Sequence, residues 1–259
     1  MPVIDAFPPG TPVWVDLQSS DPAGAAAFYR DLFGWEVAPA TDEMGGYAVA
    51  TLSGTPVTAI GPLPPMVADA GGRSTWTTYF VVDDIERAAS AATDHGGQVL
   101  VPPGELARGV FLAIVADPTG AVFGLWQQEK GSPWLRNEPG AVDWLELVAD
   151  GYENSLGFYE NVLTVGVSQT AMNEGVYTLF DVGDANVAGA SSPWAPDTPS
   201  HWLVYFQVAD LDAAIARLVG LGGATLSLPL AATGVGRWAV VVDPFGGAFA
   251  LLEPEREAA

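Results

Sequence analysis

Short apolar stretches separated by turn signals run along the whole chain, and they predict a protein built from many strands and a few helices. Residues 13–18, VWVDLQ, alternate with the period of two that is typical of a half-buried strand. The two faces of this predicted strand hold, on one side, Trp14, Asp16 and Gln18 and, on the other, Val13, Val15 and Leu17.

A helix is predicted directly after this strand. Asp21 is a typical N-cap residue and Pro22 suits the first helical position, so this pair marks the start. Apolar residues then recur at helical spacing, at Ala25, Phe28, Tyr29 and Leu32. Gly34 is expected to end the helix, because glycine readily adopts the left-handed conformation found there.

The same combination of one helix and several strands recurs along the chain. Further helices are predicted over residues 85–94, 153–162 and 211–220. Further strands are predicted over residues 47–52, 56–60, 76–82, 98–101, 109–116, 121–127, 142–148, 176–181, 185–190, 202–208, 224–227, 237–242 and 248–252. These elements form four units that each read strand-helix-strand-strand-strand.

The second half of the chain repeats the first. The stretch DPTGAVFGLW begins at Asp117, and the similar stretch DPFGGAFALL begins 126 residues later, at Asp243. Each joins an Asp-Pro-x-Gly turn to an apolar strand. Trp76 returns at Trp202 with the same offset, and the Phe-Tyr pair at 28–29 returns 130 residues later. The chain is therefore a tandem duplication.

A chain of 259 residues, 49% of them hydrophobic, is long enough for two domains of about 130 residues, each with its own core. We predict an α+β fold in which four βαβββ units build two curved sheets with helices on one face only. The other, concave face must form a cleft or meet another sheet. Clefts of this kind commonly bind small molecules.

This succession of elements resembles the glyoxalase/bleomycin-resistance/extradiol-dioxygenase superfamily, also called vicinal oxygen chelate. The resemblance rests on the Asp-capped helix with its Phe-Tyr pair and Leu-Phe-Gly end, and on the closing Asp-Pro-x-Gly strand. The WVDLQ stretch at Trp14–Gln18 is similar to that of two-domain actinobacterial members labelled glyoxalase-like or hydroxylase. The resemblance implies glyoxalase-like domains at 1–128 (modules about 11–66 and 74–128) and 141–259 (modules about 141–193 and 200–254), with a linker at 129–140.

Enzymes of this superfamily hold a divalent metal with His and Glu at fixed strand positions. By the resemblance, those positions fall here on Trp14, Thr77, Gly124, Trp144, Leu203 and Ala250. None of them offers the imidazole or carboxylate that such a metal prefers. We therefore expect no cofactor, with a divalent metal at a rearranged site as the alternative. His201, two residues before a ligand position, is the one further metal candidate.

Two carboxylates are the candidate catalytic residues. Asp16 and Glu146 occupy equivalent positions of the repeat, and each is flanked by a tryptophan on the face expected to line the cleft. Such a carboxylate can act as a general base with a raised pKa, or bind a cation. The alternative is a structural anchor bonded to the backbone or to an arginine.

The remaining candidates would bind the ligand. Aromatic side chains on the cleft face suit flat or cationic ligands, and packing in the core is their alternative role. The candidate ligand-binding residues are Trp14, Gln18, Thr77, Tyr79, Trp126, Trp144 and Tyr205.

The composition argues against several classes of binding partner. The net charge of −22 argues against nucleic acid and anionic membranes as partners, because both are bound by basic patches. No apolar run is long enough to span a membrane, no signal peptide is evident, and there are no cysteines. We therefore expect a cytoplasmic monomer or homodimer whose partner is a small molecule.

Three functions remain open. The first is a small-molecule-binding protein that lacks the usual metal ligands and sequesters an aromatic or cationic metabolite or antibiotic. The second is a metal-dependent enzyme, a glyoxalase-type lyase or an oxygenase/hydroxylase, with a rearranged site that uses Asp16, Glu146 or His201. The third is a scaffold for protein partners.

Overall fold

The computed structural model describes residues 3–4, 7–41, 44–129, 131–172 and 175–255. In spatial order, the N-terminal sheet consists of β3 (Glu36–Val37), β4 (Ala48–Leu52), β5 (Thr55–Pro62), β2 (Pro12–Ser19), β6 (Thr75–Val81), β9 (Val122–Gln128), β8 (Val110–Ala116) and β7 (Gln98–Ala107). Its helices are α1 (Pro22–Phe33), α2 (Pro65–Asp69) and α3 (Ile85–Asp94).

The C-terminal sheet repeats this order. It consists of β12 (Gly166–Met172), β13 (Gly175–Val182), β14 (Ala185–Ser191), β11 (Val142–Val148), β15 (His201–Gln207), β19 (Ala248–Pro254), β18 (Gly236–Val242) and β16 (Ala224–Thr225), and β17 (Leu230–Ala232) pairs with β18. Its helices are the 3-10 turn η2 (Tyr152–Ser155), α4 (Leu156–Val162) and α5 (Leu211–Gly220). The predicted α+β fold of four βαβββ units is confirmed.

The structure adds elements that the hydrophobic pattern does not predict. The edge strands β3 and β12 are short or largely exposed, so they carry no clear apolar alternation. Within the predicted linker 129–140, β10 (Trp134–Leu135) pairs with β1 (Val3–Ile4), and both of its side chains are fully buried. Val13, expected beside Val15 and Leu17, instead packs with Tyr79 and Val81. That expectation is wrong because the ladder between β2 and β6 is irregular between Pro12 and Trp14.

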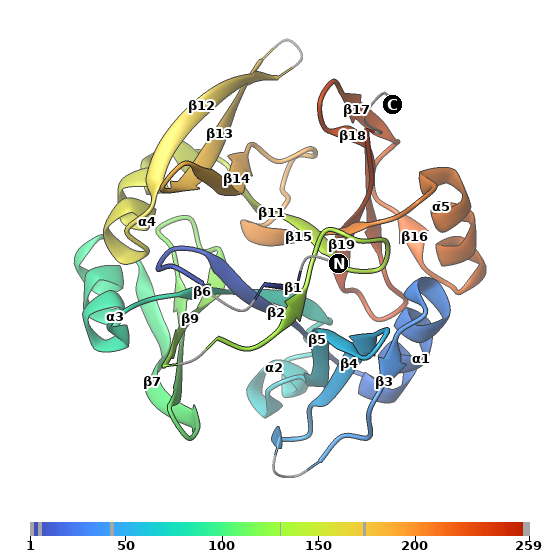
Figure 1. Cartoon of the computed structure of the whole chain (residues 1–259), viewed down its shortest axis with the longest axis horizontal. Helices are drawn as coiled ribbons and strands as arrows, with labels where there is room; N and C mark the ends of the chain where they lie inside the picture. The colour runs from blue at the N-terminus through green and yellow to red at the C-terminus, as the bar shows by residue number, and fades with distance from the viewer. Residues whose placement is uncertain (1–2, 5–6, 42–43, 130, 173–174, 256–259) are drawn as a thin grey trace.

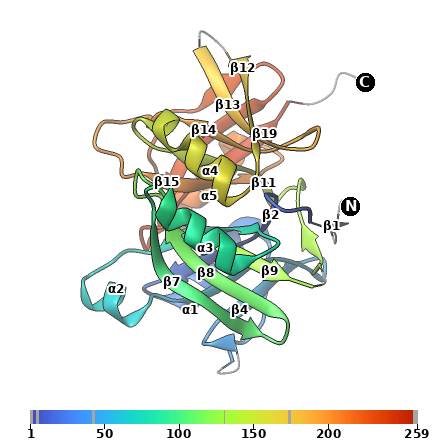
Figure 2. The same ribbon diagram turned by 90° about the vertical axis from the view of Figure 1, so that its left-hand side faces the viewer.

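The two sheets pack against each other across one shared hydrophobic core. The ring centroids of Phe80 and Trp202 lie 4.9 Å apart, and those of Trp76 and Phe206 lie 5.0 Å apart. Figure 1 shows α1 beside α5 at one end of this core and α3 beside α4 at the other, and Figure 2 shows α3 and α4 side by side where the halves meet. The helix-bearing face of each sheet thus meets the other sheet. The opposite face, here called the outer face, points away from the core.

Two reciprocal hydrogen bonds join the halves inside this core. The hydroxyl of Tyr29 on α1 donates to Oδ2 of Asp243 at 2.9 Å, and the hydroxyl of Tyr159 on α4 donates to Oδ2 of Asp117 at 2.9 Å. Burial and the neighbouring carboxylate raise the pKa of both tyrosines well above the ordinary value, so both remain protonated donors. Each half therefore supplies one donor and one acceptor to the other.

The same aspartates also form the Asp-Pro-x-Gly turns. The Oδ1 atom of each accepts backbone N–H groups of its own turn, from Thr119 and Ala121 in one half and from Phe245 and Gly247 in the other. The indoles of Trp76 and Trp202 donate to the two tyrosine hydroxyls at 3.2 Å. In each half, one oxygen of the aspartate therefore holds its own turn, and the second oxygen binds the tyrosine of the other half.

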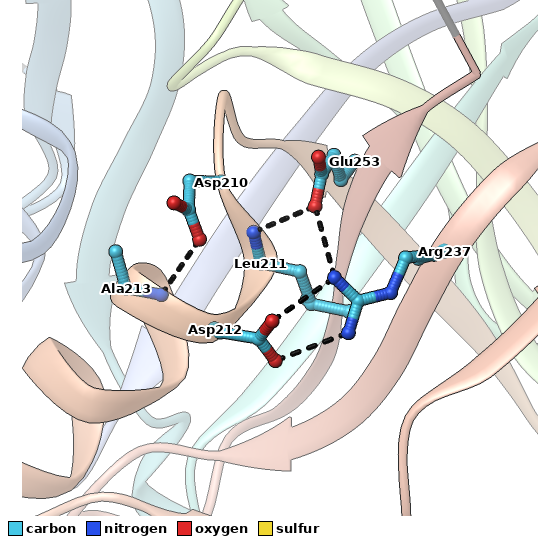
Figure 3. Close-up of polar contacts among 6 residues, drawn as sticks. All are labelled: Asp210, Leu211, Asp212, Ala213, Arg237 and Glu253. Carbon is cyan, nitrogen blue, oxygen red and sulfur yellow. Dashed lines mark hydrogen bonds and ion pairs between the residues drawn. The ribbon is translucent and has the colours of Figure 1, made fainter.

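A further duplicated contact fixes the helices that follow β6 and β15. Oε1 of Gln127 accepts the backbone N–H of Ile85 at 2.8 Å, and Oε2 of Glu253 accepts that of Leu211 at 3.0 Å. Gln127 and Glu253 occupy equivalent positions of the repeat, and in the second half Arg237 joins the network through ion pairs (Figure 3). Both halves therefore use a side chain of the closing strand to accept the first backbone N–H of a helix, in addition to the N-cap aspartates Asp84 and Asp210.

Replacement of Tyr29 by Phe should lower the free energy of unfolding by about 1–3 kcal/mol, because Oδ2 of Asp243 loses its donor inside the core. Urea unfolding of the full chain measures this. Tyr152→Phe is the matched control, because the Tyr152 hydroxyl bonds to Thr178 within one half. If Tyr29→Phe left the stability unchanged, the hydrogen bond would not hold the halves together.

Candidate functional site

The candidate residues of the first half lie together on the outer face of the N-terminal sheet. Trp14 and Asp16 of β2 lie opposite Tyr79 and Thr77 of β6, respectively, in the ladder. The Tyr79 and Trp126 rings are in edge contact, with centroids 5.8 Å apart. Every residue predicted to line a cleft in this half is therefore on one face, as the period of two requires.

Asp16 is the charged group of this cluster and is almost completely buried, at 7% exposure. The Tyr79 hydroxyl donates to its Oδ2 at 2.7 Å, whereas its Oδ1 is buried without any hydrogen-bond partner among the described residues. Burial raises the pKa of Asp16 to about 7, and the bond from Tyr79 only partly opposes this effect. An unpaired buried carboxylate oxygen is costly and leaves one acceptor free for another group.

Gly124 makes room for the ring of Tyr79. A Cβ atom at residue 124 would lie 2.0 Å from Cδ1 of Tyr79. Tyr79 therefore occupies the space that a side chain at Gly124, one of the family's metal-ligand positions, would need. The neighbouring position Thr77 is buried and offers a hydroxyl.

Tyr47 is a further member of the cluster that sequence reasoning missed. Its ring covers Gly61, where a Cβ atom would lie 2.6 Å away, and its hydroxyl hydrogen-bonds with Gln18. Burial and the charge of Asp16 raise the pKa of Tyr47 above its ordinary value. The available signal was the repeat, since Tyr177 lies 130 residues later, at the offset that relates Asp16 to Glu146.

The second half carries a similar cluster around Glu146. The Tyr205 hydroxyl donates to Oε2 of Glu146 at 2.5 Å, and Tyr177 and Ser191 also form hydrogen bonds with this carboxylate. The indole of Trp144 donates to the Tyr177 hydroxyl at 2.9 Å. Burial raises the pKa of Glu146 while these bonds oppose the effect. Because the outer faces point away from each other, Asp16 and Glu146 belong to separate sites.

His201 lies at the start of β15 with a fixed tautomer. Its Nδ1 donates to the carbonyl of Pro199 at 2.8 Å, and its Nε2 is buried without a partner in the described part of the chain. Burial lowers the pKa of the imidazole, and the Trp194 ring lies edge-on at 5.5 Å. Among the residues that the structure describes, no three His, Cys, Asp or Glu side chains group as a metal site would require. A metal at His201 stays a prediction.

A surface hollow of about 410 Å³ lies elsewhere, beside Arg237 and Glu253. Arg237 is already paired with Asp212 and Glu253, so the hollow lacks the unpaired buried group found at Asp16. In the described part of the chain, no helix is long and apolar enough to cross a membrane.

Replacement of Asp16 by Asn should change how stability depends on pH. The folded-state pKa of about 7 exceeds the ordinary value of 3.8, so the contribution of Asp16 to stability is full below about pH 4, and up to about 4 kcal/mol is lost as the pH rises through 7. An asparagine side chain cannot ionise, so the variant should exceed the wild type in stability at pH 8. Urea unfolding between pH 4 and 8 measures the difference, with exposed Asp94→Asn as control. If the stabilities of the wild type and of Asp16→Asn changed with pH in the same way, this prediction would be contradicted.

Replacement of Gly124 by Ala should destabilise the fold by about 1–3 kcal/mol, because the added methyl overlaps the Tyr79 ring. Gly104→Ala is the matched control, since its Cβ atom would meet nothing closer than 3.9 Å. Thermal unfolding of both variants tests this. Equal melting temperatures of the two variants would show that the Tyr79 ring does not need the space beside Gly124.

Comparison with known proteins places the chain in a family. Residues 11–125 and 141–251 match the family described as Glyoxalase/Bleomycin resistance protein/Dioxygenase superfamily. The chain is 39% identical over 260 residues to the glyoxylase-like protein CFP32 of Mycobacterium tuberculosis (strain CDC 1551 / Oshkosh), covering 98% of each protein. It is 34% identical over 261 residues to the anthracycline biosynthesis protein DnrV of Streptomyces peucetius, covering 95% of this chain and 94% of DnrV.

A solved structure shows the same fold. The Mn(II)-bound glyoxalase from Novosphingobium aromaticivorans is similar with a TM-score of 0.64 at 14% sequence identity, covering 96% of this chain and 83% of that protein. The two matched segments together span both halves of the duplication, and the resemblance inferred from the sequence is confirmed. The chain belongs to the glyoxalase/bleomycin resistance protein/dioxygenase superfamily.

Proposed function

We propose that the protein binds a small organic molecule on the outer face of its N-terminal sheet, with Asp16 as the hydrogen-bond acceptor. The observation that carries this proposal is the buried Oδ1 of Asp16, which has no partner among the described residues. A ligand hydroxyl or ammonium group would satisfy this oxygen. Tyr47 and Gln18 are partly exposed beside it, so we expect the ligand to enter where these two side chains lie.

The surroundings of Asp16 favour an aromatic or cationic ligand. Trp14, Tyr47, Tyr79 and Trp126 present aromatic rings on this face, and such rings attract flat and positively charged groups. The net charge of −22 also attracts cations and repels anions. An aromatic amine combines both features. Sequestration of such a metabolite or antibiotic is the role we propose.

We propose that this binding does not require a divalent metal. The family positions in this half, Trp14, Thr77 and Gly124, together offer one hydroxyl, and the Tyr79 ring fills the space beside Gly124. This donor set does not fit a divalent metal, which prefers imidazole and carboxylate ligands.

We also propose that the protein works in the reducing cytoplasm, and the absence of cysteine from its sequence supports this proposal.

A second candidate function is catalysis. A carboxyl group with a pKa of about 7 is suited to take up and release a proton near neutral pH. Asp16 would accept a proton from the substrate at Oδ1, while Tyr79 holds Oδ2 in place. One relative is named as a glyoxylase and another for anthracycline biosynthesis, and both names are consistent with an enzyme. A scaffold role, as a monomer or homodimer, is the third candidate.

Three probes that share a phenyl ring separate these possibilities. At pH 8 we expect binding to decrease in the order benzylamine, benzyl alcohol, benzoate, because Asp16 attracts the ammonium group and repels the carboxylate. Asp16→Asn should weaken benzylamine about tenfold, or about 1.4 kcal/mol. NMR titration measures each affinity. Asp94→Asn removes the same charge from an exposed site and should change the affinity little.

The outcome also distinguishes binding from metal-dependent catalysis. Equal affinities for the three probes, or none, would contradict the proposed site. Metal content and benzylamine affinity should be the same before and after chelation. Stoichiometric metal that is lost in an Asp16→Ala/Glu146→Ala double variant would instead support an enzyme with a rearranged metal site on one of the two outer faces.

A further inference from the structure

The two outer faces are copies of one ancestor, so they can be compared position by position. Each keeps a carboxylate on its first strand and a tyrosine that donates to it, Asp16 with Tyr79 in one half and Glu146 with Tyr205 in the other. Each also keeps a second tyrosine close to the first residue of the third strand of its first module, Tyr47 directly before β4 and Tyr177 within β13. Because the two faces share these features, the positions at which they differ can be identified one by one.

The first difference is polarity. Val148 stands in the second half where Gln18 stands in the first, and Leu203 stands where Thr77 does. The second outer face accordingly forms a hydrophobic cluster of its own, with the buried residues Val148, Leu203, Tyr205, Val240, Ala250 and Leu252 and the partly buried residues Trp144, Trp194, Val235 and Trp238. This packing reduces the polar surface that a ligand could contact, and Nε2 of His201 at its edge, which has no partner among the described residues, lies beside the Trp194 ring.

The second difference is the segment that joins the two modules of each half. In the second half, residues 192–200 place Trp194 against the hydrophobic cluster and beside His201. In the first half, the corresponding segment contains α2, which has no buried residue and whose Met66 is 85% exposed. The second outer face is therefore covered by its own chain, and α2 gives the first no such cover.

The third difference is the number of hydrogen bonds that each carboxylate accepts. Glu146 receives hydrogen bonds from Tyr205, Tyr177 and Ser191, and among the described residues neither of its oxygens is fully buried without a partner. Asp16 receives one bond, from Tyr79, and its Oδ1 is left alone within the same residues. Tyr47 is the counterpart of Tyr177, yet it bonds with Gln18 instead of Asp16.

The position of one glycine accounts for this third difference. In the second half Gly189 pairs with Glu146 across the ladder, and the Tyr177 hydroxyl occupies the place of its missing Cβ, 2.0 Å from that ideal position. In the first half the residue paired with Asp16 is Ala59, whose methyl fills that place. The glycine is shifted by two residues to Gly61, opposite Gln18, and the Tyr47 ring lies over it.

We propose that only the N-terminal outer face takes the ligand, one molecule per chain, and that the glycine position on β5 and β14 decides which face is open. Gly189 admits a tyrosine hydroxyl that saturates Glu146 and closes the C-terminal face. Ala59 keeps Tyr47 from Asp16 and leaves Oδ1 for a ligand that donates a hydrogen bond, such as an amine or an alcohol. This inference rests on the proposed function for the ligand itself, but the glycine arrangement can be tested without one.

Benzylamine is the probe for the first test, and the indole N–H resonances of Trp126 and Trp144 report on the two faces. Titration of the wild type should shift the Trp126 resonance and leave the Trp144 resonance in place. The double variant Ala59→Gly/Gly61→Ser copies the second half, so Tyr47 should reach Asp16 and weaken benzylamine tenfold or more. Glu146→Gln is the matched control and should keep the wild-type affinity within twofold.

A ligand-free measurement tests the same arrangement. Tyr79 and Tyr47 are the titratable groups that face Asp16, and a second hydroxyl bond would lower the pKa of that carboxyl. The fall in melting temperature between pH 5 and pH 8 should therefore be at least halved in Ala59→Gly/Gly61→Ser relative to the wild type. Ala59→Gly alone serves if the double variant does not fold.

The results distinguish a failure of the proposed glycine arrangement from a failure of the proposed ligand binding. A Trp144 shift at the same benzylamine concentration, or undiminished affinity in the double variant, would overturn the inference while leaving a binding protein. A failure of benzylamine to shift either indole would overturn the proposed function. The pH test then decides alone: an unchanged pH dependence in the double variant would overturn the glycine arrangement, and a reduced one would support it.

Discussion

The structure depends on two aspartates that each bind in two directions. Oδ1 of Asp117 and of Asp243 holds its own turn through backbone N–H groups, and Oδ2 accepts a tyrosine hydroxyl from the other half of the chain. Because charge-assisted hydrogen bonds inside a core are strong and directional, these contacts set the register between the halves as well as their attraction. The sheets form within each half, whereas the pairing of α1 with α5 and of α3 with α4 and the direction of the outer faces depend on that register.

This arrangement places the chemistry away from the interface. The inner faces of both sheets are used for the shared core of aromatic and aliphatic side chains. What remains for a ligand is the outer face of each sheet, where the period of two puts Asp16 or Glu146 among aromatic residues. The fold therefore offers two sites of common origin, and local packing decides what each can do.

Much of the fold could be predicted from the sequence, because its signals are local. The Asp21-Pro22 start and Gly34 end of α1 use capping chemistry that a few neighbouring residues determine, and the structure shows both. The face shared by Trp14, Asp16 and Gln18 follows from the pleat of a single strand. The irregular ladder that turns Val13 outward and the exposed strand β12 have no such local signal, because they arise from pairing with strands that are distant in sequence.

The candidate site could be predicted only in part for the same reason. Asp16, Tyr79 and Trp126 were recognisable from strand parity, and the structure brings them together. The role of Tyr47 depends on whether glycine stands at 59 or 61, which matters only once β5 lies beside β2. The lack of a partner for Oδ1 of Asp16 among the described residues is likewise a property of the packed protein, since no sequence pattern reports what is missing around an atom.

The reciprocal tyrosine-aspartate bonds also bear on the history of the molecule. A half chain on its own would expose an unpaired donor and an unpaired acceptor, together with the aromatic face that now forms the core. Two identical half chains would satisfy both at once, since an isologous contact supplies each group twice around a twofold axis. The fused chain therefore has the contact arrangement that a symmetric homodimer of half chains would have. Within one chain the two halves need not be identical, so one outer face can be apolar while its counterpart carries polar side chains.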